Sequence, residues 1–233
     1  MKTIRLFGIA LLTVLLSVSF SSCSKSDGDD NGHEGNTPST AKRIKKCVEN
    51  KKDNTYTYEY AYDGQGRLIQ MKYSRTGKYG DKKSIHTFSY EGNTIVEKTT
   101  NGSEVITYTL KDELIVKIKD SDTEKTITYN NGYMASWGDE RYTWANGNLI
   151  KVGNNYDSCT YEYTNLPAPS QSFRGLMSDW VMIAFYGGKT PKNLPQKSTT
   201  SPDGKVEVYE WVMKDGLPTQ CTIGFDVYTF EWE

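Results

Sequence analysis

The residues that could carry out acid–base or nucleophilic chemistry are few in this sequence, and they are scattered. His33 and His86 are the two histidines, and the sequence offers neither a recognisable partner. The patterns G-x-S-x-G, H-E-x-x-H and C-x-x-C, which build common hydrolase and metal sites, do not occur in it. Gly64-Gln65-Gly66 precedes a strand pattern rather than a helix, so it predicts a turn and not a phosphate-binding loop. We therefore expect no catalytic site, no metal and no cofactor.

Carboxylates are the other candidates, because a glycosidase needs only two, placed about 5 to 9.5 Å apart. Five glutamates are candidates by type: Glu59, Glu162, Glu207, Glu210 and Glu231. All except Glu207 lie between two aromatic residues. Side chains alternate between the two faces of a strand, so those four should point away from a core built of aromatic rings. We expect solvated strand surfaces here rather than a catalytic pair.

Cys23 ends an N-terminal export segment and is a candidate for covalent modification by lipid. Lys2 and Arg5 give a basic start, residues 6–16 form an apolar run, and Phe20-Ser21-Ser22 place small residues before the cysteine. The run is shorter than the roughly 20 residues that a transmembrane helix needs. No A-x-A-like cleavage site lies nearby, which favours a lipidated Cys23 over ordinary secretion.

The net charge of the chain that follows the export segment argues against one class of partner. Removal of residues 1–22 takes Lys2 and Arg5 from the 28 basic residues and leaves 26 against 29 acidic ones, a net charge of −3. This balance argues against a nucleic-acid partner.

Three cysteines follow Cys23 in the chain and can form at most one disulfide, and we expect small buried side chains at these positions. They are Cys47, Cys159 and Cys221.

Residues 23–41 are polar, and after Cys23 we expect a disordered acidic tether. Residues 27–32 match the opening of a calcium-binding loop, but Pro38 stands where that loop needs its bidentate glutamate. A solvated spacer is therefore the better interpretation. The acidic cluster also resembles the signal that sends Bacteroidetes-type lipoproteins to the outer face of the outer membrane, although Lys25 interrupts it.

We expect residues 42–233 to form a single β-rich domain built from a repeated unit. In each unit two aromatic or apolar residues flank one polar residue, and a turn rich in Gly and Asn follows. The clearest copies are Tyr60-Ala61-Tyr62, Phe88-Ser89-Tyr90, Ile127-Thr128-Tyr129, Tyr142-Thr143-Trp144 and Tyr209-Glu210-Trp211. This spacing puts both flanking residues on one face of a strand, and the turn closes a hairpin. The sequence thus predicts a mainly β fold, a curled antiparallel meander of hairpins.

The spacing of the repeat supports this prediction. The anchors Tyr90, Leu110, Tyr129, Trp144 and Tyr163 are separated by 20, 19, 15 and 19 residues. The units resemble the YD-type repeats of large secreted bacterial proteins, which have the pattern Y-D-x-x-G-R-L. The segment Tyr62-Asp63-Gly64-Gln65-Gly66-Arg67-Leu68 is the nearest copy, and later copies lose the arginine. The resemblance implies a rolled sheet of hairpins, with too few copies to enclose a cargo.

The hairpin pattern is interrupted once, where the sequence predicts an amphipathic helix over residues 172–186. Apolar residues recur there at steps of three and four: Phe173, Leu176, Met177, Trp180, Val181 and Ala184. Ser172 can cap the start, and Gly187 lies beyond the end. We expect this helix to pack on the apolar face of the sheet, because a one-layer sheet needs a second layer to form a core.

The signal segment, the tether, the hairpin repeats and the segment Asn193-Leu194-Pro195 after the helix together resemble a Bacteroidetes family of small surface lipoproteins of unknown function. The resemblance covers nearly the whole chain. It implies a lipid on Cys23 and a place at the outer membrane, exposed on the cell surface. It brings no activity and no binding residues.

The 17 tyrosines and 5 tryptophans exceed what a small core needs. Rings on an open sheet face can stack on sugars or anchor a peptide. We therefore expect a non-catalytic surface module that binds a glycan, a peptide or a partner surface protein, with Tyr133, Trp137, Tyr142 and Trp144 as candidate ligand-binding residues. Two alternatives stay open. One is a structural or accessory lipoprotein whose sheet edges pair with a partner protein, and the other is an extracellular carbohydrate-active hydrolase.

Overall fold

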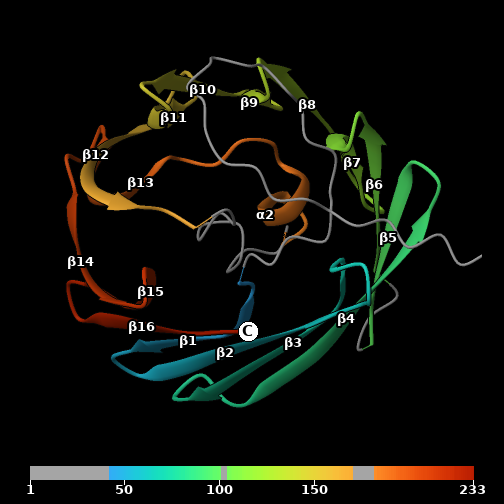
Figure 1. The fold of residues 1–233 in the computed structure, drawn as a ribbon, viewed down its shortest axis with the longest axis horizontal. Helices are drawn as coiled ribbons and strands as arrows, with labels where there is room; N and C mark the ends of the chain where they lie inside the picture. Colours follow the sequence, from blue (N-terminus) through green and yellow to red (C-terminus); the bar gives the residue numbers. More distant parts are fainter. Residues whose placement is uncertain (1–41, 101–103, 170–180) are drawn as a thin grey trace, which may run out of the picture. The chain divides into compact units, whose positions relative to one another are not determined.

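Sixteen antiparallel strands pair in chain order, and the first pairs with the last (Figure 1). The computed structural model describes residues 42–100, 104–169 and 181–233, which belong to one compact unit, Pro38–Glu233. A second unit, Met1–Thr37, lies outside the described residues. The predicted mainly β fold of antiparallel hairpins is confirmed, and the curled meander is a closed barrel rather than a sheet with two edges. Pairing between β1 and β16 closes the sheet into a barrel.

The strands are β1 (Ile44–Lys51), β2 (Asn54–Tyr62), β3 (Leu68–Gly77), β4 (Lys82–Glu91), β5 (Thr94–Thr99), β6 (Val105–Lys111), β7 (Leu114–Lys119), β8 (Glu124–Asn130), β9 (Tyr133–Trp137), β10 (Glu140–Ala145), β11 (Asn148–Gly153), β12 (Ser158–Pro167), β13 (Asn193–Ser201), β14 (Val206–Lys214), β15 (Leu217–Ile223) and β16 (Asp226–Trp232). Within the described residues the helix is α2 (Ile183–Tyr186). No helix in this part of the chain has the length and apolar character to span a bilayer.

Each strand turns one set of side chains into the barrel and the other toward solvent, as the period of two requires. On β2, Tyr58 and Tyr60 are 9% and 5% exposed, whereas Glu59 between them faces solvent. The same arrangement holds for the other three glutamates that lie between aromatic residues, Glu162, Glu210 and Glu231. The prediction that these carboxylates point away from the core is confirmed.

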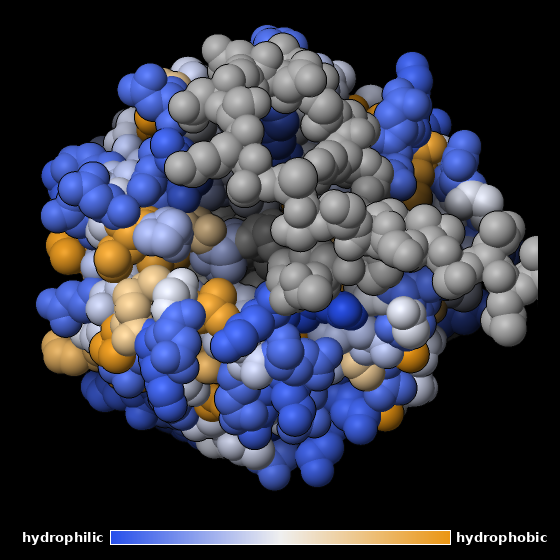
Figure 2. All heavy atoms as spheres, in the orientation of Figure 1, coloured by the Kyte–Doolittle hydropathy of each residue, from blue (hydrophilic) through white to orange (hydrophobic). Residues whose placement is uncertain are grey.

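The outer face of the described barrel is mainly polar. Hydrophilic residues also cover much of the coloured surface at the end of the barrel that Figure 2 shows. The outward positions of β2, β4, β12 and β16 carry Thr57, Glu59, Thr87, Ser89, Thr160, Glu162, Thr229 and Glu231. Exposed apolar residues interrupt this surface on several strands and turns. The largest group on one strand is Val206, Val208 and Val212 of β14, which are 51%, 52% and 51% exposed. The inner face is the opposite, and its aromatic and aliphatic side chains form the core.

A hydrogen bond from an aromatic side chain to a backbone carbonyl of the preceding strand recurs around the barrel. In each case a tyrosine hydroxyl or a tryptophan indole N–H on an even-numbered strand donates, over 2.7–2.8 Å. The pairs are Tyr62 to Ile44, Tyr90 to Leu68, Tyr129 to Ile115, Trp144 to Met134, Tyr163 to Leu149, Trp211 to Pro195 and Trp232 to Pro218. We call the seven donors the clamp residues.

The clamp residues explain the aromatic repeat in the sequence. Each of them lies at the end of its strand pair opposite to the turn that connects the two strands. The turn therefore holds one end of the pair and the clamp holds the other. In β6 the anchor position of the repeat holds Leu110, which has no polar side-chain atom to donate. A hydrogen bond of this kind contributes about 1 kcal/mol net, so the series matters through its repetition.

Residues 181–192, which precede β13, form the plug, and Figure 1 shows their helix α2 inside the ring of strands. Val181 and Met182 are fully buried. The backbone N–H groups of Lys189 and Lys192 donate to the carbonyls of Gly132 and Gly147, at 2.8 and 2.9 Å. These bonds attach the plug to the β8–β9 and β10–β11 turns.

The predicted helix over residues 172–186 is not confirmed. Residues 172–180, which include Trp180, lie outside the described residues, and α2 covers four residues at the predicted C-terminal end. That short helix packs on two clamp residues. The ring of Phe185 lies 6.0 Å from that of Tyr62, and the ring of Tyr186 lies 6.3 Å from that of Tyr90.

Replacing Tyr129 by Phe removes one clamp bond and leaves the carbonyl of buried Ile115 without its donor. We expect Tyr129→Phe to lower the free energy of unfolding by about 1–2 kcal/mol. Tyr156→Phe is the matched control, because Tyr156 is 87% exposed and should cost less than about 0.5 kcal/mol. Urea denaturation followed by circular dichroism measures both, and equal stabilities would show that the clamps do not stabilise the barrel.

Candidate functional site

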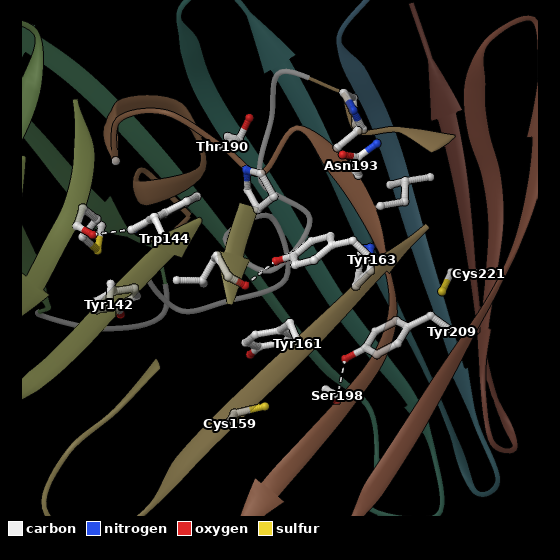
Figure 3. Close-up of a pocket in the computed structure, with 18 of the residues that line it drawn as sticks. Tyr142, Trp144, Cys159, Tyr161, Tyr163, Thr190, Asn193, Ser198, Tyr209 and Cys221 are labelled. Atoms are coloured by element: carbon white, nitrogen blue, oxygen red, sulfur yellow. Dashed lines mark hydrogen bonds between the residues drawn. The ribbon is translucent and has the colours of Figure 1, made fainter. Parts of the chain in front are cut away.

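A cavity of about 620 Å³ lies inside the barrel, between the plug and the inner faces of β9 to β16. This volume falls within the range of small-molecule binding pockets. Aromatic rings form much of its wall, and Figure 3 shows several of them around the opening in the lumen. The aromatic lining residues are Trp137, Tyr142, Trp144, Tyr161, Tyr163, Tyr209, Trp211, Tyr228 and Phe230.

Three of the four aromatic residues that the sequence singled out line this cavity: Trp137, Tyr142 and Trp144. Tyr133 does not. Its ring packs on that of Trp144 at 4.8 Å, and it borders a separate cavity of about 410 Å³. Trp144 is also a clamp residue, because its indole N–H donates to the Met134 carbonyl. Ligand binding by these residues stays a prediction.

The remaining aromatic wall was missed at the sequence level, although its signal was present. Tyr161 and Tyr163 flank Glu162, and Tyr209 and Trp211 flank Glu210. Because the glutamate of each triplet points to solvent, its two neighbours on the strand point into the barrel. The closure of the barrel could not be predicted from the sequence. It is the closure that makes β14 to β16 face the same cavity as β10 and β12.

Few charged groups border the cavity, and each has a described contact. The Tyr142 hydroxyl donates to Oε2 of Glu140 at 2.8 Å. The Lys205 ammonium lies 2.7 Å from Oε1 of Glu207. Lys189 reaches from the plug, and its Nζ lies 5.1 Å from the centre of the Tyr133 ring. Of the five candidate carboxylates, Glu207 alone lines the cavity. Glu140 was missed, although alternation with Tyr142 places it on the inner face.

The cysteines of the described residues are all free. Cys47 and Cys221 are buried, as expected, whereas Cys159 is half-buried. Burial raises the pKa of the Cys47 thiol to about 12, with a further contribution from the charge of Glu49. Burial also raises the pKa of Cys221 to about 12. Both thiols therefore stay protonated and weakly nucleophilic at neutral pH.

His86 does have partners, so the interpretation of an isolated histidine was wrong. Its Nδ1 lies 2.6 Å from Oε1 of Glu97, and its Nε2 lies 3.1 Å from Oγ of Ser84. The Tyr108 hydroxyl donates to the other oxygen of Glu97 at 2.5 Å. Burial, and then the Glu97 charge, raise the pKa of Tyr108 well above its usual value, so this hydroxyl stays a donor.

The order Ser84, His86, Glu97 has the contacts of a nucleophile, a base and an orienting carboxylate. Ser84 and Glu97 are 8% and 1% exposed, and none of the three borders either cavity. We therefore interpret the group as a buried polar network that satisfies Glu97. The contact between His86 and Glu97 could have been predicted from the sequence. The hairpin turn at Gly92 places the two residues on facing strands, two residues apart in register.

No protein-family model and no curated protein matches this chain. Its fold is similar to that of two solved structures, described as porin-like proteins from Bacteroides uniformis and Bacteroides vulgatus. The TM-scores are 0.64 and 0.57, and the sequence identities are 17% and 12%. Each comparison covers 82% of this chain and 98% of the other. At these identities the likeness shows a shared barrel fold and nothing about activity.

Glu97→Ala removes the acceptor that His86 and Tyr108 share. We expect a loss of about 3–5 kcal/mol in the free energy of unfolding, because two buried donors lose their partner. Glu59→Ala is the matched control on the solvent face, expected to change stability by less than about 0.5 kcal/mol. Denaturant unfolding compares the two, and an equally mild effect of Glu97→Ala would contradict the network.

Proposed function

We propose that this protein is a lipid-anchored protein of the outer membrane that binds a small, mainly apolar molecule inside its barrel without catalysing a reaction. The aromatic cavity carries this proposal. Clefts of this size with apolar and aromatic walls and few polar groups are the usual form of a small-molecule site. Tyrosine and tryptophan supply large contact surfaces at a low cost in side-chain entropy.

The distribution of side chains argues against a membrane-spanning pore. A transmembrane barrel directs an apolar band toward lipid and keeps polar residues in its lumen. Here the alternation is reversed, since Tyr58, Tyr60 and Phe88 point inward while Glu59 and Thr87 point outward. The plug also occupies part of the lumen. A barrel of this kind suits an aqueous environment with a membrane tether, and the tether is supported by the export pattern before Cys23.

The alternative function, an accessory lipoprotein that contacts a partner protein, cannot use strand addition in the described barrel. Strand addition needs an unpaired sheet edge, and every described strand of the barrel pairs on both sides. A partner protein would therefore have to contact the outer face or the turns. No described contact favours such a partner, whereas the cavity favours a small ligand.

Filling the cavity tests the proposal. Cys159 points into it, whereas the next residue, Thr160, points to solvent. We expect Cys159→Trp to abolish the fluorescence increase of the neutral apolar probe N-phenyl-1-naphthylamine, because an indole takes up the space that the probe needs. Thr160→Trp adds the same group on the outside and should bind the probe like the wild type.

Circular dichroism tests whether both variants fold. Cys159→Leu fills the cavity with a smaller side chain and replaces Cys159→Trp if the tryptophan variant does not fold. A wild-type protein that does not bind the probe, or a folded Cys159→Trp or Cys159→Leu variant that binds it undiminished, would contradict a lumenal site.

Lipid attachment has a separate test. We expect Cys23→Ala to abolish the attachment of acyl chains, and we expect residues 23–233 with Cys23→Ala, exported behind a cleavable secretory signal, to appear in the soluble fraction. Fractionation and intact-protein mass spectrometry measure the two effects. Retention in the membrane of this unlipidated chain without residues 1–22 would contradict anchorage by lipid and would point to the barrel itself as the membrane-bound part.

A further inference from the structure

We infer that the cavity selects organic cations with an apolar body, and that Glu140 supplies the counter-charge. This inference rests on the proposed function and names the class of ligand. Three side chains with a formal charge border the cavity: Glu140, Glu207 and Lys189. They differ in whether the protein already compensates that charge.

Two of the three charges have a partner of their own. Glu207 forms an ion pair with Lys205. The Lys189 ammonium lies over the face of the Tyr133 ring, a position that an aromatic ring stabilises. Glu140 differs, because its described contact is the neutral hydroxyl of Tyr142.

The neighbouring arginine does not compensate Glu140. The Arg141 guanidinium donates instead to two turn carbonyls, those of Gly138 and Glu140, at 3.0 and 2.9 Å. No Lys, Arg or His nitrogen of the described residues forms an ion pair with the Glu140 carboxylate. A half-buried carboxylate has lost part of its hydration shell, so a positive charge nearby stabilises its ionised form.

The rings beside Glu140 favour the same kind of ligand. Trp137 pairs with Glu140 across the β9–β10 hairpin, and Tyr142 lies two residues further along on the same face. The Trp137 ring already has one cation near it, since Nζ of Lys125 lies 5.8 Å from the ring centre. A carboxylate framed by aromatic rings is the arrangement that binds ammonium groups, through charge and through the ring quadrupole.

The size of the cavity requires more than a small cation. Its volume of about 620 Å³ exceeds that of an ammonium group, and the rest of the wall is apolar. Leu149, Leu194 and Ile223 belong to that part. The ligand should therefore combine one positive group with a hydrocarbon or aromatic body, as an amphiphilic amine or quaternary ammonium compound does.

A matched set of probes tests the selectivity. 4-Phenylbutylamine, 4-phenylbutanol and 4-phenylbutyrate share one body and differ in charge. Isothermal titration calorimetry at pH 7 on the mature chain, residues 23–233 with Cys23→Ala, which avoids detergent, gives the three affinities. We expect the amine to bind at least tenfold more tightly than the alcohol, and the carboxylate to bind most weakly.

Glu140→Gln should remove the preference for the amine and leave the affinity for the alcohol unchanged. Glu140→Asp keeps the charge and should keep the preference, which also covers the case in which the glutamine variant does not fold. Glu231→Gln, on the outer face, is the control and should behave like the wild type.

The outcomes separate this inference from the proposed function. If the alcohol binds but the wild type shows no preference for the amine, the charge selectivity is wrong and the lumenal site stands. The same holds if folded Glu140→Gln keeps the full preference. If none of the three compounds and no N-phenyl-1-naphthylamine binds, the proposed function itself fails.

Discussion

The structure depends on one repeated interaction, the hydrogen bond from an inward aromatic side chain to a carbonyl of the preceding strand. In this barrel each of the strand pairs that the clamps join has a turn at only one end. The clamp residues hold the other end. To do so they must point into the lumen, because a side chain on the outer face meets water that competes for the same carbonyl. The aromatic repeat is therefore a requirement of the fold before it is a property of a site.

The cavity follows from the same constraint. Rings that clamp the strand pairs also line the lumen, so Trp144, Tyr163 and Trp211 serve both as donors to the backbone and as walls of the cavity. The plug fills part of the lumen with the buried side chains of Val181 and Met182, and the cavity lies beside it along β9 to β16. Since the walls are fixed by hydrogen bonds, the cavity is preorganised and little side-chain entropy remains to be lost when a ligand binds.

Much of the local structure could be predicted from the sequence, because alternation and turn chemistry act over a few residues. The outward glutamates such as Glu162 and the hairpins themselves follow from these rules. Closure could not be predicted, since it pairs β1 with a strand at the far end of the chain. Tyr133 does not line the larger cavity, because the β8–β9 register shifts between Thr128 and Tyr129 and a bulge breaks the period of two. Met134 and Trp137 consequently both reach the cavity at an odd spacing.

The central claim is that this barrel keeps its aromatic face inside and its polar face in water. Sedimentation velocity of the mature chain, residues 23–233 with Cys23→Ala, in detergent-free buffer, together with circular dichroism and tryptophan fluorescence, tests it most directly. The account predicts a monodisperse β-rich protein whose tryptophan emission is shifted to the blue, because the clamp indoles are shielded from water. Aggregation in buffer, with β structure appearing only when micelles are added, would contradict it.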